Sequence, residues 1–513
     1  MEWRRAAAAV AGATAGLVHE RMVDPPTREE ILAVYRAGPA AVVALVEGLV
    51  RHLMTLEGRV AALEDRLALD SHNSSKPPSS DLGRPKPAPR SLRPAPGTTG
   101  RAPGGQPGHP GTTLRLVAAP DRLALHRPAQ CAACGAGLAA GRLLARLDGE
   151  RRQVVELPPP QLAVVEHRVV RVTCAACGAE TAGTFPAGVA QPVQYGDRLK
   201  AVGVYLRAYQ LLPYARTQEL LEDLFGAAPA EGTLQAAEAA CSEALAAPEA
   251  AIARALRGAA SAGFDETGMR VAGRREWLHV ACTPTLTHYG VHARRGSRAT
   301  DALGILPAFT GTAVHDAYPS YLRYPDCTHA LCNAHLLREL IFLHEQHHQA
   351  WADEMATLLV TAKDLADAAR AAGQAHVDPV TRAAIDAHYD HLLWQGRAAN
   401  PATAPPADRP RRRGCAPQSK AQNLLDRLTT SRGAVLAFLD DLRVPFDHNQ
   451  AERDLRMLKV QQKISGGFRT APGAAAFARI RGYVSTLRKQ GLPVLAALES
   501  VFAGSPALPG LAG

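Results

Sequence analysis

The sequence contains no run of about 20 consecutive apolar residues, the length that a membrane-spanning helix requires. A membrane is therefore not an expected partner. Cysteine is scarce, with nine in 513 residues, and four of these stand in two Cys-x-x-Cys pairs. An odd number of cysteines with this spacing argues against a disulfide framework. It indicates metal binding in a reducing compartment.

Acidic residues are also outnumbered, since 48 Asp and Glu face 58 Lys and Arg, giving a formal net charge of +10 and a pI of about 9.3. Net charge alone fits a polyanion partner or a merely basic soluble protein equally well. The basic residues cluster in 76–101, 409–420 and 453–463, which favours the polyanion. At this length, three or more structural units are expected.

The first 21 residues are Ala-rich after Arg4-Arg5 and mimic a weak signal peptide. We interpret them as an over-long gene start, with Met22 as the initiator. Thr27-Arg-Glu-Glu30 is typical of a capping box that begins a short helix, and Gly38-Pro39 would end it.

Apolar residues then recur at alternating steps of four and three, which is a heptad pattern. They are Val42, Val46, Leu49, Leu53, Leu56, Val60, Leu63 and Leu67. Residues 1–72 are therefore predicted to form a helical region whose coiled coil mediates self-association. A single helix packed on its own domain is the alternative.

Residues 73–112 are rich in Pro, Gly and Ser and predict an extended basic linker. Lys76, Arg84 and Lys86 are its candidate contacts to a DNA backbone, and a solvated spacer fits the charge equally well.

Residues 113–195 contain Cys131-Ala-Ala-Cys134-Gly and Cys174-Ala-Ala-Cys177-Gly. Each pair offers two thiolates, and the glycine that follows permits a tight turn. Residues 151–157 and 164–173 between the pairs have β-strand composition. We predict a zinc ribbon with one structural zinc; four free thiols are the alternative. Its ligands would be Cys131, Cys134, Cys174 and Cys177.

Residues 196–258 have helical composition, and the segments from Thr217 to Gly226 and from Glu231 onward resemble a helix-turn-helix. The second helix is Ala-rich and carries Glu238 and Glu243 but no Arg or Lys. Packing is therefore at least as good an interpretation of this helix as base reading.

From residue 259 the pattern changes to strands at 263–271, 277–282 and 288–294, followed by a short helix near 301–306 and a strand at 312–315. The core is predicted to span 259–503, with a tail at 504–513. A mostly helical insertion at about 340–435 contains a Pro-rich basic loop. Arg411, Arg412 and Arg413 of this loop are either DNA contacts or part of a solvated excursion.

Three carboxylates stand out in this core. Asp265 falls on the first predicted strand, Asp316 ends the fourth, and Glu452 opens a basic helix. Hard divalent cations prefer carboxylate oxygen, and two of them can hold the attacking and leaving oxygens of a phosphodiester displacement. Arg456, Lys459 and Lys463 follow Glu452 on one helix face, where they could contact a phosphate backbone or form ordinary surface pairs.

Several segments, in the same order, resemble transposases of the insertion sequence 66 family over residues 27–503. They are Asn73-Ser-Ser-Lys-Pro-Pro-Ser-Ser-Asp81, Gly104-Gly-Gln-Pro-Gly-His-Pro-Gly111, Cys332-Asn-Ala-His335, Gln418-Ser-Lys-Ala-Gln-Asn-Leu-Leu-Asp-Arg427 and Asp447-His-Asn-Gln-Ala-Glu452.

The resemblance implies a multidomain α/β protein whose ribonuclease H-like catalytic core follows a coiled-coil helix, a zinc ribbon and a helical domain. It implies that Asp265, Asp316 and Glu452 form the catalytic trio and bind two magnesium or manganese ions. The partners would be double-stranded DNA, both element ends and target, and accessory proteins of the element. The location would be the bacterial cytoplasm, at the nucleoid.

His448 stands where this family usually has asparagine, and Gly467 and Thr470 also depart from its pattern. With Cys327 and His329, the pair Cys332 and His335 superficially offers a second zinc site, but four ligands crowded on one short run disfavour it. His335 is interpreted instead as support for the active site or as a phosphate contact.

Two other functions compete with an active transposase. One is a catalytically silent regulator that binds DNA, which the intact carboxylate trio disfavours. The other is a plain nuclease, which the coiled coil and zinc module disfavour because they suit the pairing of two DNA ends.

Overall fold

The computed structural model describes residues 27–74, 81, 114–126, 128–139, 151–157, 160–401 and 418–510. Residues 1–21, Lys76, Arg84, Lys86 and Arg411–Arg413 lie outside these ranges. The chain divides into two compact units. The first comprises Met1–Arg93, Asp197–Leu212 and Ala236–Gly513, and the second comprises Pro94–Gly196 and Pro213–Gln235. The predicted domain boundaries remain predictions.

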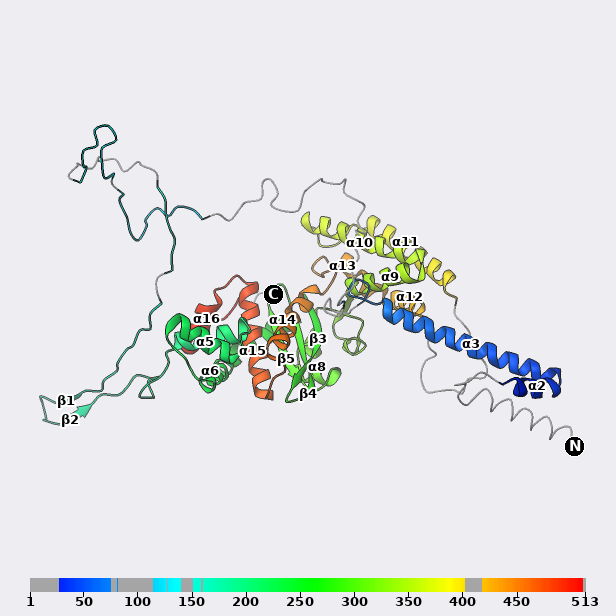
Figure 1. Ribbon diagram of the computed structural model, residues 1–513, viewed down its shortest axis with the longest axis horizontal. Helices are drawn as coiled ribbons and strands as arrows, with labels where there is room; N and C mark the ends of the chain where they lie inside the picture. Colours follow the sequence, from blue (N-terminus) through cyan, green and yellow to red (C-terminus); the bar gives the residue numbers. More distant parts are fainter. Residues whose placement is uncertain are drawn as a thin grey trace. The chain divides into compact units, whose positions relative to one another are not determined.

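The centre of the first unit is a five-stranded mixed sheet with the order β5-β4-β3-β6-β7 (Figure 1). Strand β4 is antiparallel to both of its neighbours, whereas β3, β6 and β7 are parallel. The strands are β3 (Ser261–Val271), β4 (Arg274–Cys282), β5 (Thr287–His292), β6 (Thr312–His315) and β7 (Thr328–Leu331).

The four strands predicted in this region and the short helix before β6, α8 (Ser297–Leu303), are confirmed. The sequence did not predict β7. Short 3-10 turns flank β6 at η3 (Leu306–Ala308) and η4 (Tyr321–Arg323).

Two C-terminal helices, α14 (Asn449–Ser465) and α15 (Ala471–Lys489), pack against β3, β4 and β5. Their apolar faces bury Ala451, Leu455, Leu458 and Ala478 in one cluster with residues of the three strands. Helix α15 approaches β5 closely at Gly482, where an added Cβ would lie 3.3 Å from the carbonyl oxygen of Thr287.

A helical subdomain connects β7 to α14, and its hydrophobic core continues onto Val314 of β6 and Ala330 and Leu331 of β7. Its helices are α9 (Asn333–His347), α10 (Ala350–Ala371), α11 (Pro379–Ala399), α12 (Lys420–Thr430) and α13 (Arg432–Asp440). This confirms the predicted helical character of 336–371 and 379–395, with a break where His348 adopts a left-handed φ of 51°.

The base of this subdomain is closed by Asn333, which is 1% exposed. Its side-chain amide donates to the carbonyl oxygens of Val435 (3.0 Å) and Phe446 (3.3 Å), and its backbone N–H donates to Phe446 (3.1 Å). The chain therefore leaves the sheet and returns to it at one point.

A third cluster combines helices from before the sheet with the C-terminal helices. These elements are α4 (Asp197–Val204), the π-helical turn η2 (Tyr205–Tyr209), α6 (Glu231–Ala244), α15 and α16 (Val494–Phe502). Helix α7 (Ala246–Arg257) instead buries Ile252 and Leu256 in a separate cluster with Phe264 of β3. Helix α6 buries Ala237 and Cys241 in the same cluster as Tyr483 of α15. This face of α6 therefore packs against the protein instead of reading bases.

The predicted capping box at Thr27 is confirmed and opens α2 (Arg28–Arg36), and Gly38 with φ of 101° separates it from α3 (Pro39–Ala68). The C-terminal end of α3 is held by Asp65, which pairs with His347 (3.1 Å) and Lys420 (3.2 Å). By length and composition alone α3 could cross a membrane, a test that core helices of soluble proteins also pass.

The second unit contains the two cysteine pairs, the hairpin β1 (Arg171–Thr173) and β2 (Glu180–Ala182), and α5 (Tyr214–Phe225). The strand predicted at 151–157 does not form, and of the strand predicted at 164–173 only 171–173, which is β1, forms. A strand needs a hydrogen-bonded neighbour. Val154 and Val164 are 91% and 92% exposed, so their β-branched side chains have no sheet face to cover.

A buried ion pair fixes α14 to the sheet. Lys489 Nζ lies 2.7 Å from Asp454 Oδ2, with side chains only 9% and 8% exposed. The same ammonium donates to the carbonyl oxygens of Thr283 (2.9 Å) and Leu286 (3.0 Å), which uses all three of its protons. Tyr289 Oη donates to the backbone carbonyl of Asp454 (2.6 Å).

We expect Lys489→Met to destabilise the contact between α14 and β5 by about 3–5 kcal/mol, because it leaves the Asp454 carboxylate buried without a counter-charge. In the full-length chain, hydrogen–deuterium exchange of α14 amides should accelerate about a hundredfold or more.

The matched control is Lys463→Met, which removes an exposed lysine from α14 itself, whereas Lys489 ends α15. It should change exchange little, and equal acceleration by both variants would contradict the assigned role of Lys489.

Candidate active site

The two predicted aspartates lie at the same level of adjacent parallel strands. Gly263 of β3 pairs with Val314 of β6. Asp265 and Asp316 each follow two residues later in the sequence. Asp265 Oδ1 accepts from the backbone N–H of Glu266 (2.8 Å), and Asp316 Oδ1 accepts from that of Tyr318 (2.9 Å). Both carboxyl groups are thus oriented by the backbone.

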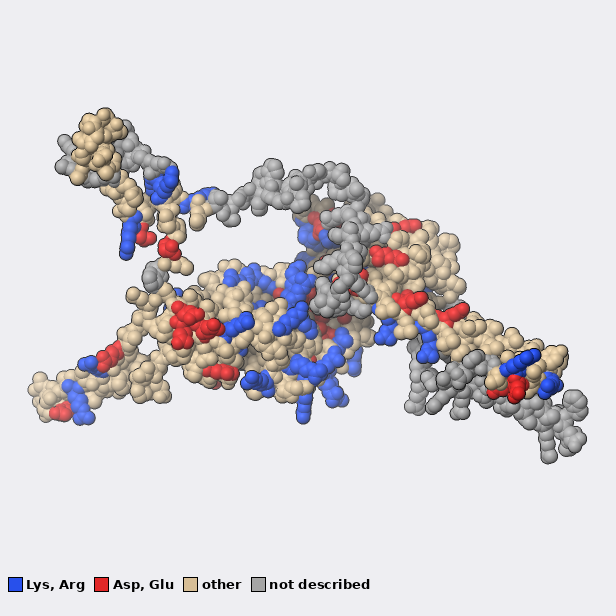
Figure 2. All heavy atoms as spheres, viewed as in Figure 1, with Lys and Arg blue, Asp and Glu red and all other residues tan. Residues whose placement is uncertain are grey.

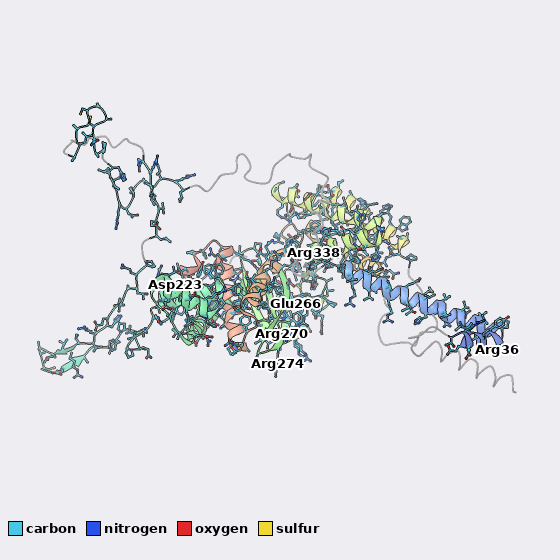
Figure 3. All side chains as sticks on the ribbon, in the orientation of Figure 1. Arg36, Asp223, Glu266, Arg270, Arg274 and Arg338 are labelled. Atoms are coloured by element: carbon cyan, nitrogen blue, oxygen red, sulfur yellow. The ribbon has the colours of Figure 1, made fainter. Side chains whose placement is uncertain are left out.

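Glu452 lies in the first turn of α14, and its side chain is 20% exposed. The preceding residue, Ala451, packs beside Gly263, since a Cβ built on that glycine would lie 3.6 Å from the Ala451 methyl. Two α9 side chains approach the Glu452 carboxylate: His335 Nε2 lies at 3.7 Å and Arg338 at 3.8 Å. Figure 3 labels Arg338 and, on the sheet, Glu266.

Two stacked histidines connect these carboxylates. The rings of His335 and His448 lie 5.2 Å apart at an interplanar angle of 28°. His448 Nε2 lies 3.6 Å from Asp265 Oδ2, just as His335 faces Glu452. Cys332, at the start of α9, accepts from the backbone N–H of His448 at 3.5 Å. His448, which departs from the family pattern, is therefore buried at the centre of this cluster and is 3% exposed.

Charge interactions in this cluster oppose the effect of burial. Burial alone would raise the pKa of the Cys332 thiol, but its electrostatic interactions with the neighbouring His335 and His448 lower it to about 6. Burial disfavours the charge on His448, yet its contacts with Asp265 and Cys332 hold its pKa well above the ordinary value. The pKa of His335 is also raised, through Cys332. The cluster therefore favours a thiolate beside protonated imidazoles.

Sequence reasoning missed a second group of residues behind Asp265. Glu266, with a side chain only 2% exposed, pairs with Arg295 (2.6 Å) and accepts from the Tyr321 hydroxyl. Burial raises the pKa of Glu266, against these two hydrogen bonds. The Arg295 guanidinium lies 4.2 Å from the Tyr318 ring centroid. The only sequence signal for this group was the Asp-Glu pair itself.

The three predicted cations on α14 are all exposed. Arg456 and Lys463 face solvent, whereas Lys459 Nζ donates to the carbonyl oxygen of Gly268 on β3 at 2.9 Å. Figure 2 shows Lys and Arg side chains gathered near the turn between β3 and β4, where Figure 3 labels Arg270 and Arg274.

Each cysteine pair folds as a tight turn. Cys131 and Cys174 accept backbone hydrogen bonds from Gly135 (2.9 Å) and Gly178 (2.8 Å) through their carbonyls, and both glycines have φ above 70°. Backbone N–H groups within each turn lower the pKa of the Cys131 and Cys174 thiols. Lowered thiol pKa values fit zinc ligands. The four cysteines are not gathered around one point in the described residues.

We expect Cys134→Ser and Cys177→Ser each to lower the bound zinc by about one equivalent per chain, because a four-thiolate site loses most of its zinc affinity when one thiolate is removed. Elemental analysis of purified full-length protein measures this. The control is Cys415→Ser, a cysteine outside both pairs. Unchanged zinc in both pair variants would contradict the assignment.

Comparison with known families gives three matches. Residues 192–476, more than half of the chain, match the family described as Transposase IS66 family. Residues 128–178, which include all four paired cysteines, match the zinc-finger binding domain of transposase IS66. Residues 26–115 match a family of unknown function, DUF6444. The search found no matching curated protein. The large catalytic-region match and the adjoining zinc-finger match agree, and the chain belongs to the IS66 family of transposases.

Proposed function

We propose that this chain binds the ends of its element and catalyses metal-dependent DNA strand cleavage and strand transfer through Asp265, Asp316 and Glu452. The observation that carries the proposal is the common level of Asp265 and Asp316 on adjacent strands, with Glu452 joined to this site through His335 and His448. Three carboxylates from three separate elements suit a phosphoryl-transfer site.

The three carboxylates would hold two divalent cations, magnesium or manganese, whose chemistry is to stabilise the attacking and leaving oxygens of an in-line displacement. In the first reaction, a water oxygen bonds to phosphorus and the bond to the 3′ oxygen breaks, which leaves a 3′ hydroxyl. In the second, the oxygen of that hydroxyl bonds to a target phosphorus, and the bond from this phosphorus to the target's 3′ oxygen breaks, which releases a target 3′ hydroxyl. No protein side chain needs to form a covalent intermediate.

A ribonuclease H-like core is part of this proposal. Its support is the strand order β5-β4-β3-β6-β7, in which β4 alone runs opposite to the rest. Asp265 occupies the central strand and Asp316 follows its parallel neighbour. The catalytic helix α14 then packs across β3 and β4.

Double-stranded DNA would contact the exposed basic residues next to this site. Arg456 and Lys463 lie on α14, and Arg270 and Arg274 extend from the hairpin of β3 and β4. Such contacts bind the phosphate backbone without reading bases. The zinc-finger region supplies a further DNA-binding candidate, and the basic segments with Lys76 and Arg411 remain predictions outside the described residues.

We expect Glu452→Gln to lower cleavage of DNA carrying the gene's own flanking ends about a thousandfold, because it removes a charged ligand from the metal site. Labelled-strand cleavage with magnesium or manganese measures this, and wild-type product should end in a 3′ hydroxyl at the element boundary.

The matched control is Glu354→Gln, which neutralises an exposed carboxylate on α10. It should cut like wild type. Equal cutting by the Glu452 variant would contradict its role. Binding of ends without cleavage by any version would favour the silent regulator, or dependence on accessory proteins of the element, which addition of those proteins would distinguish.

Self-association through α3 is the second part of the proposal. The heptad residues lie on one face of the helix, and Leu53, Val60, Leu63 and Leu67 are 52–66% exposed. An apolar stripe of this length is what a partner helix covers in a coiled coil. A second copy of the chain is the proposed partner, because two DNA ends require two active sites.

We expect the double variant Leu56→Glu and Leu63→Glu to convert multimers to monomers, since two charges in the seam cannot be buried. Sedimentation velocity of the full-length chain measures the change. Met54→Glu, which places the same charge on an exposed position away from the seam, should leave the multimer intact. A monomeric wild type would contradict the proposal.

A further inference from the structure

The cluster of Cys332, His335 and His448 has the composition of a metal site. One ligand atom of each residue lies within 4.8 Å of the other two. Cys332 and His335 sit at the start of α9, whereas His448 precedes α14, so the fold joins two distant segments here. Cys332 is 1% exposed and His448 is 3% exposed, which makes the position nearly closed to solvent.

Each histidine ring has one nitrogen unaccounted for. The Nε2 atoms face Glu452 and Asp265, but Nδ1 of His335 and Nδ1 of His448 are both buried without a hydrogen-bond partner. A buried ring nitrogen without a partner is costly, and native proteins rarely leave one so. Two such nitrogens in one pocket beside a buried thiol indicate a ligand.

The other candidate ligands of this region lie elsewhere. His329 Nδ1 hydrogen-bonds to His315 (2.9 Å), and its Nε2 contacts the carbonyl of Tyr324 (3.0 Å). Cys327 also contacts that carbonyl, at 3.4 Å. The grouping of four ligands on one short run, considered from the sequence, is therefore not the one that the fold assembles.

We propose that Cys332 Sγ, His335 Nδ1 and His448 Nδ1 bind one zinc ion, separate from the zinc of the finger region. Zinc accepts thiolate and imidazole at about 2.3 and 2.0 Å, which sets such atoms about 3.5 Å apart on a tetrahedron. The three residues present ligand atoms within 4.8 Å of one another, so zinc binding would draw them together by at most about 1.3 Å. Sulfur and nitrogen donors exclude magnesium and calcium, which require oxygen.

This site would act on the carboxylates through the histidines. A metal on Nδ1 fixes the tautomer with its proton on Nε2, and metal-bound histidines commonly donate that proton to a carboxylate. His448 would then donate toward Asp265 and His335 toward Glu452, so both are positioning residues. The zinc proposal itself does not depend on either carboxylate binding magnesium.

Metal content tests the proposal. Full-length wild type should contain about two zinc ions per chain, and the finger variant Cys134→Ser with Cys177→Ser should retain about one. In that variant, cobalt should replace the remaining zinc and give tetrahedral visible bands with a charge-transfer band from a single thiolate. Adding His448→Asn, which supplies the residue usual in the family, should abolish the bands.

The matched control is His329→Asn in the same finger variant, since it removes a nearby histidine outside the cluster. It should keep the cobalt bands. A finger variant that binds no cobalt would overturn the proposal without any change in the core, so misfolding of the His448 variant cannot obscure the answer. Bands that survive His448→Asn would overturn it as well.

Discussion

The packing of helices α14 and α15 on the sheet depends on one buried ion pair. Lys489 neutralises Asp454 and satisfies two carbonyls of the loop before β5, so helices α14 and α15 and the sheet edge are joined at one point. Glu452 precedes Asp454 by two residues, and its place in the first turn follows from that anchor. Separating a buried ion pair costs several kcal/mol, by the usual order of magnitude, so this pair fixes the position of α14.

The sheet and the helical subdomain contribute different parts of the site. Parallel pairing of β3 and β6 places the two aspartates together, and this requires only the register of a few backbone hydrogen bonds. The third side is built by α9, which carries His335 and Arg338 to within 4 Å of Glu452. The insertion therefore borders the candidate site, and its hydrophobic core is shared with β6 and β7.

Much of this could be predicted from local sequence. Alternating apolar residues located β3 to β6, and the strand order then placed Asp265 beside Asp316. The tight turns at the two cysteine pairs were predicted from the Cys-x-x-Cys spacing. Most of the strand structure expected between them did not form, because composition does not show whether a segment has a strand to pair with. The contact of His448 with Cys332 was beyond sequence reasoning, since it joins residues 116 positions apart. A single departure from the family pattern was its only signal.

The closed neck at Asn333 has an evolutionary consequence. The subdomain starts at Asn333 and finishes at Phe446, and these two residues are hydrogen-bonded to each other. These hydrogen bonds hold the two ends of the long segment together, so they offset the entropic cost of closing it. Lengthening or trimming the far helices leaves the neck unchanged. The outer part of the subdomain is thus free to diversify among relatives, while the residues at its root, Cys332 and His335, stay under the geometry of the carboxylate site.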